Sequence, residues 1–226
     1  MVSGIVQRME RGNVFIDLGR TTGILAFEEQ IPSERYRNGE RIKAYLYSVE
    51  ETPRGINIRL SRTHPKLIEE LFKQEVPEIA NGVVEIKSIA REPGSRSKIA
   101  VASHDRHVDP VGSCVGQRGV RVSTVMNELG GEKIDIIEWS DDQRKFVSDS
   151  LSPARVQKID INTEERRAFI TVAEDQQSLA IGKGGQNVRL AAKLTGYKID
   201  ISSAGGVNVA QTDGETVITE ENAKNS

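Results

Sequence analysis

The sequence predicts a chain of three small domains, an all-β barrel followed by two copies of one α/β unit. Short alternating apolar runs occupy residues 1–62, a helical period begins at His64, and a five-residue glycine motif recurs 66 residues further on. Hydrophobic residues make up 37% of the 226 residues and aromatic residues only 4%, which favours several small aliphatic cores over one large core.

The first 62 residues are expected to form five short strands separated by turn residues. Five strands with interspersed glycines are typical of a small closed barrel, and the oligonucleotide-binding (OB) barrel fits best. Its aromatic residues are candidates for stacking on unpaired bases, with Phe15 preferred as the surface ring over Phe27, Tyr45 and Tyr47. The expected strands are Val2–Arg8, Asn13–Leu18, Gly23–Phe27, Arg41–Val49 and Gly55–Leu60.

An internal repeat defines the remaining domains. The segment Val115–Gly119 (VGQRG) recurs as Ile181–Gly185 (IGKGG), each between similar strand and helix patterns. The repeated unit reads helix, strand, strand, helix, glycine loop, helix, strand, and it spans residues 63–138 and then 139–203. No linker separates the copies, so we expect a rigidly docked pair with Trp139 packed at the junction.

Charge is distributed unevenly along the chain. The whole chain carries a net charge of −2, whereas residues 204–226 alone carry −3 and Lys87–Arg121 carries +4. We therefore expect residues 204–226 to be an acidic, flexible tail, with at most a short strand near Thr216–Thr219. The basic charge is concentrated around the first glycine loop.

A Gly-x-x-Gly loop that opens a helix is suited to binding a phosphate. Glycine lets a sugar-phosphate chain approach the backbone, and the N–H groups at the positive end of the helix dipole attract the anion. Two copies in matched α/β contexts resemble KH domains, whose loop and aliphatic groove hold about four unpaired nucleotides. Gln186 and Asn187 are expected to read base edges. The expected RNA-binding residues are Gly116, Gln117, Arg118, Gly119 and Arg121 in the first copy, Gly182, Lys183, Gly184, Gly185, Gln186, Asn187 and Arg189 in the second, and Phe15 in the barrel.

Other kinds of site find little support. Gly182-Lys183 lacks the Ser or Thr and the first glycine of a nucleotide-binding P-loop, and no acid/base pair or nucleophile elbow is recognisable. His104, Asp105, His107, Asp109 and Cys114 lie close together, but their spacing matches no common metal site, and Cys114 is expected to pack in a core. We expect no metal and no cofactor. One cysteine, no leader and no apolar span favour the cytoplasm and no membrane association.

Longer matches identify a family. The segments 109–122 (DPVGSCVGQRGVRV) and 131–137 (GEKIDII) resemble the first KH domain of the NusA family of bacterial transcription elongation factors. Residues 180–191 (AIGKGGQNVRLA) resemble its second KH domain, and residues 60–65 (LSRTHP) resemble the junction between its S1 barrel and first KH domain. The resemblance covers about residues 1–203 in the order S1, KH, KH.

The resemblance implies a non-enzymatic factor that binds nascent single-stranded RNA at RNA polymerase and modulates pausing, termination and antitermination. Expected partners are RNA, the polymerase and other termination or antitermination factors, and the chain is expected to be a monomer. Family members carry an N-terminal polymerase-binding domain that is lacking here, so we expect a reduced polymerase contact. Ala26 stands where many S1 domains have a base-contacting histidine, which weakens the expected grip of the barrel. The alternative is an RNA-binding module of an RNA-processing or ribosome-associated protein.

Overall fold

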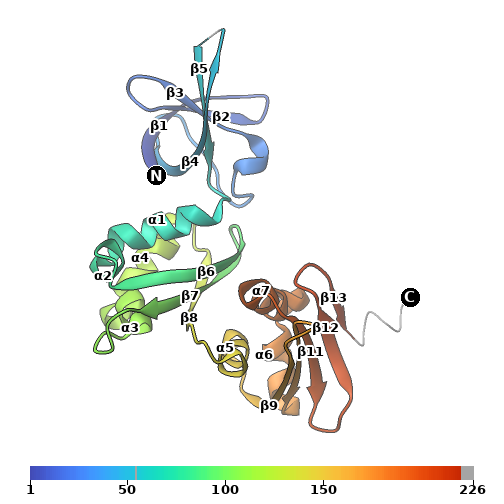
Figure 1. The fold of residues 1–226 in the computed structure, drawn as a ribbon. Coiled ribbons are helices and arrows are strands. Elements are labelled where there is room, and N and C mark those ends of the chain that lie inside the picture. Colours follow the sequence, from blue (N-terminus) through green and yellow to red (C-terminus); the bar gives the residue numbers. More distant parts are fainter. Residues whose placement is uncertain (54, 220–226) are drawn as a thin grey trace.

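The barrel and two α/β units expected from the sequence are present. The computed structural model describes residues 1–53 and 55–219, which form three bodies in chain order (Figure 1). The first is a closed five-stranded barrel with strand order β1-β2-β3-β5-β4, in which β3 runs parallel to β5. Val14, Ile16 and Leu60 fill its interior, because alternate residues of each strand point inward. The strands are β1 (Val2–Glu10), β2 (Asn13–Asp17), β3 (Thr22–Leu25), β4 (Arg41–Thr52) and β5 (Gly55–Ser61).

The first α/β unit follows directly from β5. Its sheet has the order β6-β7-β8, with β8 parallel to β7, and its helices pack on one face around Phe72, Ile99 and Leu129. His64 caps α1 by accepting a hydrogen bond from the Lys66 N–H, and a proline opens the helix. The elements are α1 (Pro65–Glu75), α2 (Pro77–Ala80), β6 (Val84–Glu92), β7 (Arg96–Ser103), α3 (Pro110–Val115), α4 (Val120–Glu128) and β8 (Lys133–Glu138).

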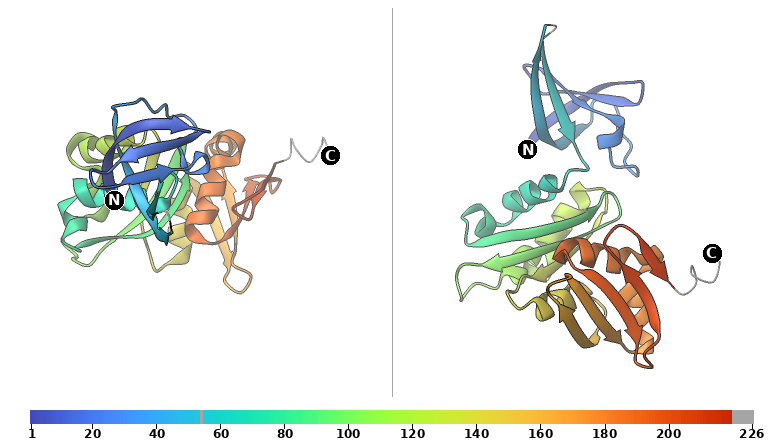
Figure 2. Two further views of the ribbon diagram at one scale, coloured as in Figure 1. Left: turned by 90° about the horizontal axis from the view of Figure 1, so that it is seen from above. Right: turned by 45° about the vertical axis from the view of Figure 1, so that its right-hand side comes forward.

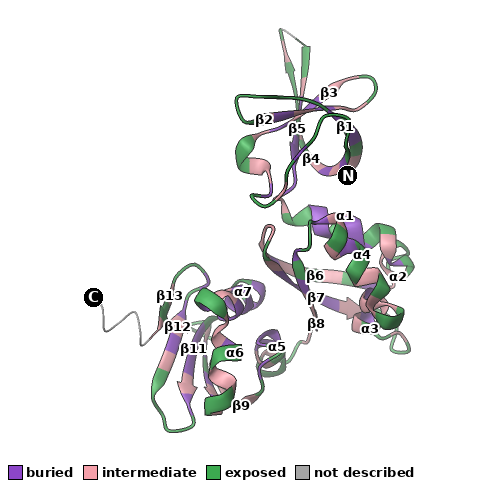
Figure 3. Cartoon of the chain, turned by 180° about the vertical axis from the view of Figure 1, so that it is seen from behind, coloured by how far each residue is buried: buried purple, intermediate pink, exposed green. Residues whose placement is uncertain are grey.

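The second unit repeats this order and adds two strands. Asp142 caps its first helix, and the sheet has the order β13-β12-β11-β10-β9. The core face of this sheet carries Ile170 and Ile201 against the helices, and Figure 3 shows α7 largely buried. The elements are α5 (Gln143–Ser150), β9 (Val156–Asn162), β10 (Arg167–Val172), α6 (Gln177–Ile181), α7 (Gln186–Thr195), β11 (Lys198–Ser203), β12 (Asn208–Thr212) and β13 (Val217–Thr219).

The two added strands correct one expectation. The segment 204–219 is not a flexible tail, since β12 pairs with β11 and β13 pairs with β12. Ala210 and Thr212 are buried, so the segment belongs to the second unit. The short strand allowed near Thr216–Thr219 is present as β13, whereas β12 was not predicted, because its few alternating residues form a strand only by pairing with the open edge of the preceding β11. The last part of the expected tail, residues 220–226, lies outside the described residues.

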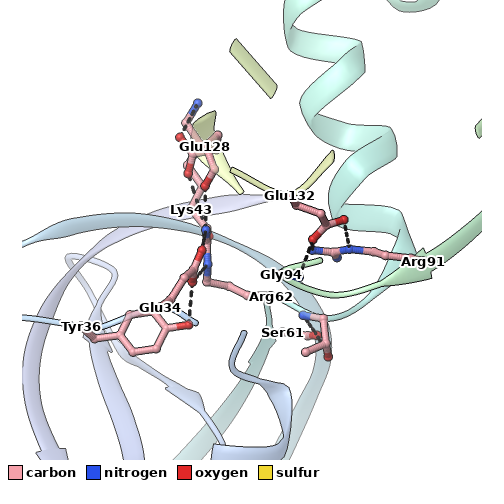
Figure 4. A network of polar contacts seen from close by, with 10 residues as sticks. Glu34, Tyr36, Lys43, Ser61, Arg62, Arg91, Gly94, Glu128 and Glu132 are labelled. Carbon is pink, nitrogen blue, oxygen red and sulfur yellow. Dashed lines mark hydrogen bonds and ion pairs between the residues drawn. The ribbon is translucent and has the colours of Figure 1, made fainter. Parts of the chain in front are cut away.

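A buried arginine joins the barrel to the first α/β unit. Arg62 donates two hydrogen bonds to the Glu34 carboxylate, one to the Lys43 carbonyl and one of 2.8 Å to the Glu128 carbonyl at the end of α4 (Figure 4). Its side chain is only 4% exposed. Burial opposes the charge, but the hydrogen bond and charge of Glu34 outweigh it and raise the pKa of the guanidinium. The joint is therefore fixed by directional bonds to both domains.

The two α/β units are docked through an apolar contact. Helix α7 of the second unit packs across β6 and β7 of the first, and the figures show the two units side by side (Figures 1 and 2). The shared cluster contains Ala90, Ala100 and Ile137 from the first unit and Phe146, Leu190 and Leu194 from the second, with Trp139 against it. Trp139 thus lies at the junction as expected.

Candidate nucleic-acid interface

The two glycine loops follow nearly the same backbone path. Gly116 and Gly182 open them with φ/ψ of 74°/171° and 76°/169°. The third loop residues, Arg118 and Gly184, are left-handed with φ of 54° and 58°, and the closing glycines have φ of 76° and 74°. A left-handed conformation costs a non-glycine residue about 1–2 kcal/mol. Arg118 therefore carries backbone strain, and such strain is concentrated at functional sites.

The middle of each loop is free to donate hydrogen bonds. In the described part of the chain, the backbone N–H groups of Gln117, Arg118, Lys183 and Gly184 have no hydrogen-bond partner. Each loop leads directly into the first turn of α4 or α7, whose positive dipole end lies beside these donors. The arrangement can hold a phosphate oxygen on the backbone alone.

Three of the expected long side chains also remain available. Gln117, Arg118 and Lys183 are exposed, and within the described residues their side chains make no hydrogen bond or ion pair. Unpaired cations beside unpaired N–H groups form an electropositive surface around each loop. These side chains could contact a phosphate held at the loop N–H groups.

Other expected RNA contacts are engaged inside the protein. Arg121 donates to Glu78 at 3.0 Å and to the Ser113 carbonyl at 2.7 Å. Arg189 and Gln186 both donate to Glu92 of the first α/β unit, each at 2.7 Å. Burial disfavours ionised Glu92, but these two hydrogen bonds outweigh it and lower the pKa of its carboxyl group. Arg189 and Gln186 therefore hold the two units together.

Asn187 serves a structural role. Its residue is 5% exposed, and its side-chain amide donates to the carbonyls of Leu151, Leu179 and Ala180 at 2.9–3.1 Å. The expectation that Asn187 reads base edges is wrong, because all its donors are used within the fold. Asn187 lies on the buried face of α7, where it bonds to the nearby α6 and to the more distant end of α5, and residue type alone does not predict this.

Some aromatic side chains of the barrel are contacted by other residues, and others are exposed to solvent. Phe15 points away from the core, and the Arg8 guanidinium lies 4.1 Å from its ring centroid. Tyr45 stacks on His64 at 4.7 Å between centroids. Phe27 is 72% exposed and Tyr47 is 40% exposed. Phe27 is therefore the most accessible aromatic ring of the described barrel, although the sequence pattern favoured Phe15.

The loop before the first glycine loop contains several side chains of metal-ligand type. In residues 1–53 and 55–219, no three His, Cys, Asp or Glu side chains are arranged to hold a metal ion. Cys114 is fully buried, and burial raises the pKa of its thiol to about 12, so it packs in the core of the first unit. None of the described helices has the length and apolarity to cross a bilayer.

Comparison with known proteins gives the same domain order. Residues 1–61 match the S1 RNA binding domain, residues 62–139 the NusA-like first KH domain and residues 143–209 the NusA-like second KH domain. The chain is 54% identical over 205 residues to the transcription termination/antitermination protein NusA of Thermus thermophilus, which covers 90% of this chain and 53% of that protein. The NusA protein of Bacillus subtilis is 53% identical over 203 residues, covering 90% of this chain and 55% of its own length. The chain thus spans about half the length of these relatives. It belongs to the NusA family, of which it contains the S1 domain and both KH domains.

Proposed function

We propose that this chain binds single-stranded RNA and is the RNA-binding region of a transcription factor that acts on nascent RNA at RNA polymerase. The relatives it resembles are named for transcription termination and antitermination. We propose the same processes here, in the bacterial cytoplasm and without enzymatic activity. The partners would be the transcript, the polymerase and other termination or antitermination factors, and the chain would act as a monomer.

The observation that carries this proposal is the pair of matching loops with unused donors. Within residues 1–53 and 55–219, each loop has two N–H groups without a partner, beside Gln117 and Arg118 in the first loop and Lys183 in the second. A neutral ligand would not require cations beside a helix N-terminus, whereas a phosphodiester uses both. Single-stranded RNA is favoured over a free phosphate because each loop borders an open cleft and does not close around its ligand.

The test is RNA binding by the whole chain and by two loop variants. An unstructured, fluorescently labelled RNA is titrated with the wild type, with Gln117→Asp/Arg118→Asp and with Lys183→Asp/Gly184→Asp. Aspartate tolerates the left-handed backbone better than most residues, so folding is expected to persist and circular dichroism checks this. Both variants should lose most of the affinity, because each KH domain raises the effective concentration of RNA at the other.

Salt dependence tests the electrostatic part separately. Roughly four to six phosphate contacts predict a slope of about −3 to −4 for log affinity against log salt. A slope near zero, or unchanged binding by both folded variants, would contradict the proposal.

The alternative of an RNA-processing enzyme is tested by incubating labelled RNA with the chain, magnesium and phosphate. Intact RNA is expected, and shortened products would overturn the non-enzymatic role.

A further inference from the structure

The second KH domain carries a hairpin that has no counterpart in the described first domain. Strands β12 and β13 extend its sheet past β11, with Ala210 opposite Ile201 and Thr212 opposite Val217 (Figures 1 and 3). The first domain's sheet ends at β8. The two domains therefore present different surroundings to similar loops.

The hairpin lies directly against the second glycine loop. A Cβ added to Gly185 would be 2.7 Å from Val217, so the strand and the loop are in close contact. Together they border a cleft of about 560 Å³. The loop and α6 supply Gln177, Ile181 and Lys183 on one side, and the hairpin supplies Val209, Val217 and Thr219 on the other.

The corresponding cleft of the first domain has a different chemistry. It measures about 720 Å³ and is bordered by Glu78, Asp109 and His107, with no strand beside it. Carboxylates near a phosphate path oppose RNA binding, although Arg121 neutralises Glu78. Among the described residues, both clefts have aliphatic residues and free loop N–H groups; the second differs because Val209 and Val217 of the hairpin stand beside Lys183 and no described carboxylate borders it.

We propose that the β12–β13 hairpin is a base-contacting wall, so that the second KH domain binds unpaired bases of RNA more tightly than the first. This inference rests on the proposed RNA-binding function. A base has flat apolar faces that suit Val209 and Val217, while its phosphate is held by Lys183 and the loop. The occupant is therefore a nucleotide of single-stranded RNA, since the cleft offers apolar surface and positive charge side by side.

Buried side chains and turn hydrogen bonds hold the β12–β13 hairpin against the rest of the second domain. Ala210 and Thr212 are buried, and Val209 and Val217 pack against the core of the second domain. Asp213 closes the turn by accepting hydrogen bonds from two following N–H groups at 3.0 Å. A wall with this much buried contact acts as part of the cleft and does not need to open for RNA to enter.

Adjacent residues of β13 provide a matched test. Val217 faces the loop, whereas the side chain of Ile218 is 55% exposed on the opposite face of the strand. Val217→Ala should weaken RNA binding by the full chain about fivefold, the equivalent of roughly 1 kcal/mol for lost aliphatic contact. Ile218→Ala should change affinity less than twofold. Thermal melting followed by circular dichroism reports whether both variants remain folded.

Crosslinking supplies a readout that does not depend on a variant. RNA containing 4-thiouridine should crosslink to peptides of residues 208–219 as well as to the second loop. If wild-type chain fails to bind RNA, the proposed function fails. If it binds, but Val217→Ala equals Ile218→Ala and no crosslink reaches the hairpin, only the present inference fails. Tighter binding by Val217→Ala would also overturn it, because the hairpin would then obstruct the RNA.

Discussion

Arg118 gives a prediction in which stability and function move in opposite directions. Replacing Arg118 by glycine removes a left-handed strain of about 1–2 kcal/mol, while the freer unfolded chain costs about 0.4–1 kcal/mol. The free energy of unfolding should therefore rise by roughly 0.5–1 kcal/mol. The same change removes an exposed cation beside the loop N–H groups. Losing one solvent-exposed phosphate contact, worth about 1 kcal/mol, should weaken RNA binding about fivefold.

The assay uses the only tryptophan of the chain, Trp139, whose fluorescence reports on the junction of the two KH domains during urea unfolding. The control for RNA affinity is Arg166→Gly, which also removes a cation from a left-handed residue, φ 49°, in the turn between β9 and β10. Since it also removes a hydrogen bond to the Gly196 carbonyl and a contact with the Tyr197 ring, only its RNA affinity is compared. The control should leave RNA affinity unchanged. Arg118→Gly should also reduce the magnitude of the salt slope by about 0.7. Equal RNA affinities for the two variants would refute the reasoning, because they would show that Arg118 is not held in its strained conformation for RNA.

Three further outcomes follow from the geometry. Gly119→Ala should lower the free energy of unfolding by about 1–2 kcal/mol, because alanine is strained at positive φ. Gly185→Ala should lower it further, because its added Cβ would also collide with Val217 of β13. Equal losses in urea unfolding would contradict this. Glu92→Gln should lower stability at pH 7 by about 1–2 kcal/mol, since it weakens the bond from Arg189. The lowered pKa of Glu92 means that this contribution is fully present above the ordinary carboxyl pKa and is lost as the pH falls through the lower folded pKa. The stability difference between wild type and variant should therefore shrink as denaturation curves are recorded at progressively more acidic pH. Leu190→Ala, at a fully buried position between the domains, should lower the free energy of unfolding by about 2–5 kcal/mol, and a loss below 1 kcal/mol would mean that the interface relaxes around the cavity.

The sequence predicts those parts of the fold whose formation depends on neighbouring residues. The barrel follows from alternating strands with turn residues, and the KH domains follow from a repeat that includes the glycine loop and the strand and helix patterns around it. The loop glycines with Arg118 and Lys183 stay predicted phosphate contacts, because residue type and spacing carry the chemistry of phosphate binding, and both side chains are exposed. The loops themselves have matching backbones, as their repeated sequences predict.

Long-range partners were not predictable from those patterns. Gln186 and Arg189 were expected to face RNA, but each reaches Glu92, which is more than 90 residues away in sequence. Lys98 is fully buried in a strand, where it donates to Asp135 at 3.0 Å and to the Ser152 carbonyl at 2.9 Å. A charged residue in a strand predicts an exposed face, and only the docked second domain explains its burial.

Both domain junctions combine apolar burial with directional polar bonds, and this bears on how the chain would hold RNA. The junction between the KH domains combines apolar burial around Leu190 with the bonds of Glu92, so it resists both separation and rotation. The junction between the barrel and the first KH domain also buries apolar surface, since Ile31 of the barrel lies in the core of that KH domain, and it adds the buried Arg62 with partners on both sides. Buried ion pairs contribute little net stability but strongly disfavour arrangements that leave a charge unpaired. Arg62 therefore fixes the angle of the barrel more than it stabilises the fold. A chain whose three domains keep fixed angles loses less entropy when RNA spans them, so its contacts at the two loops and at the barrel add more fully to the affinity.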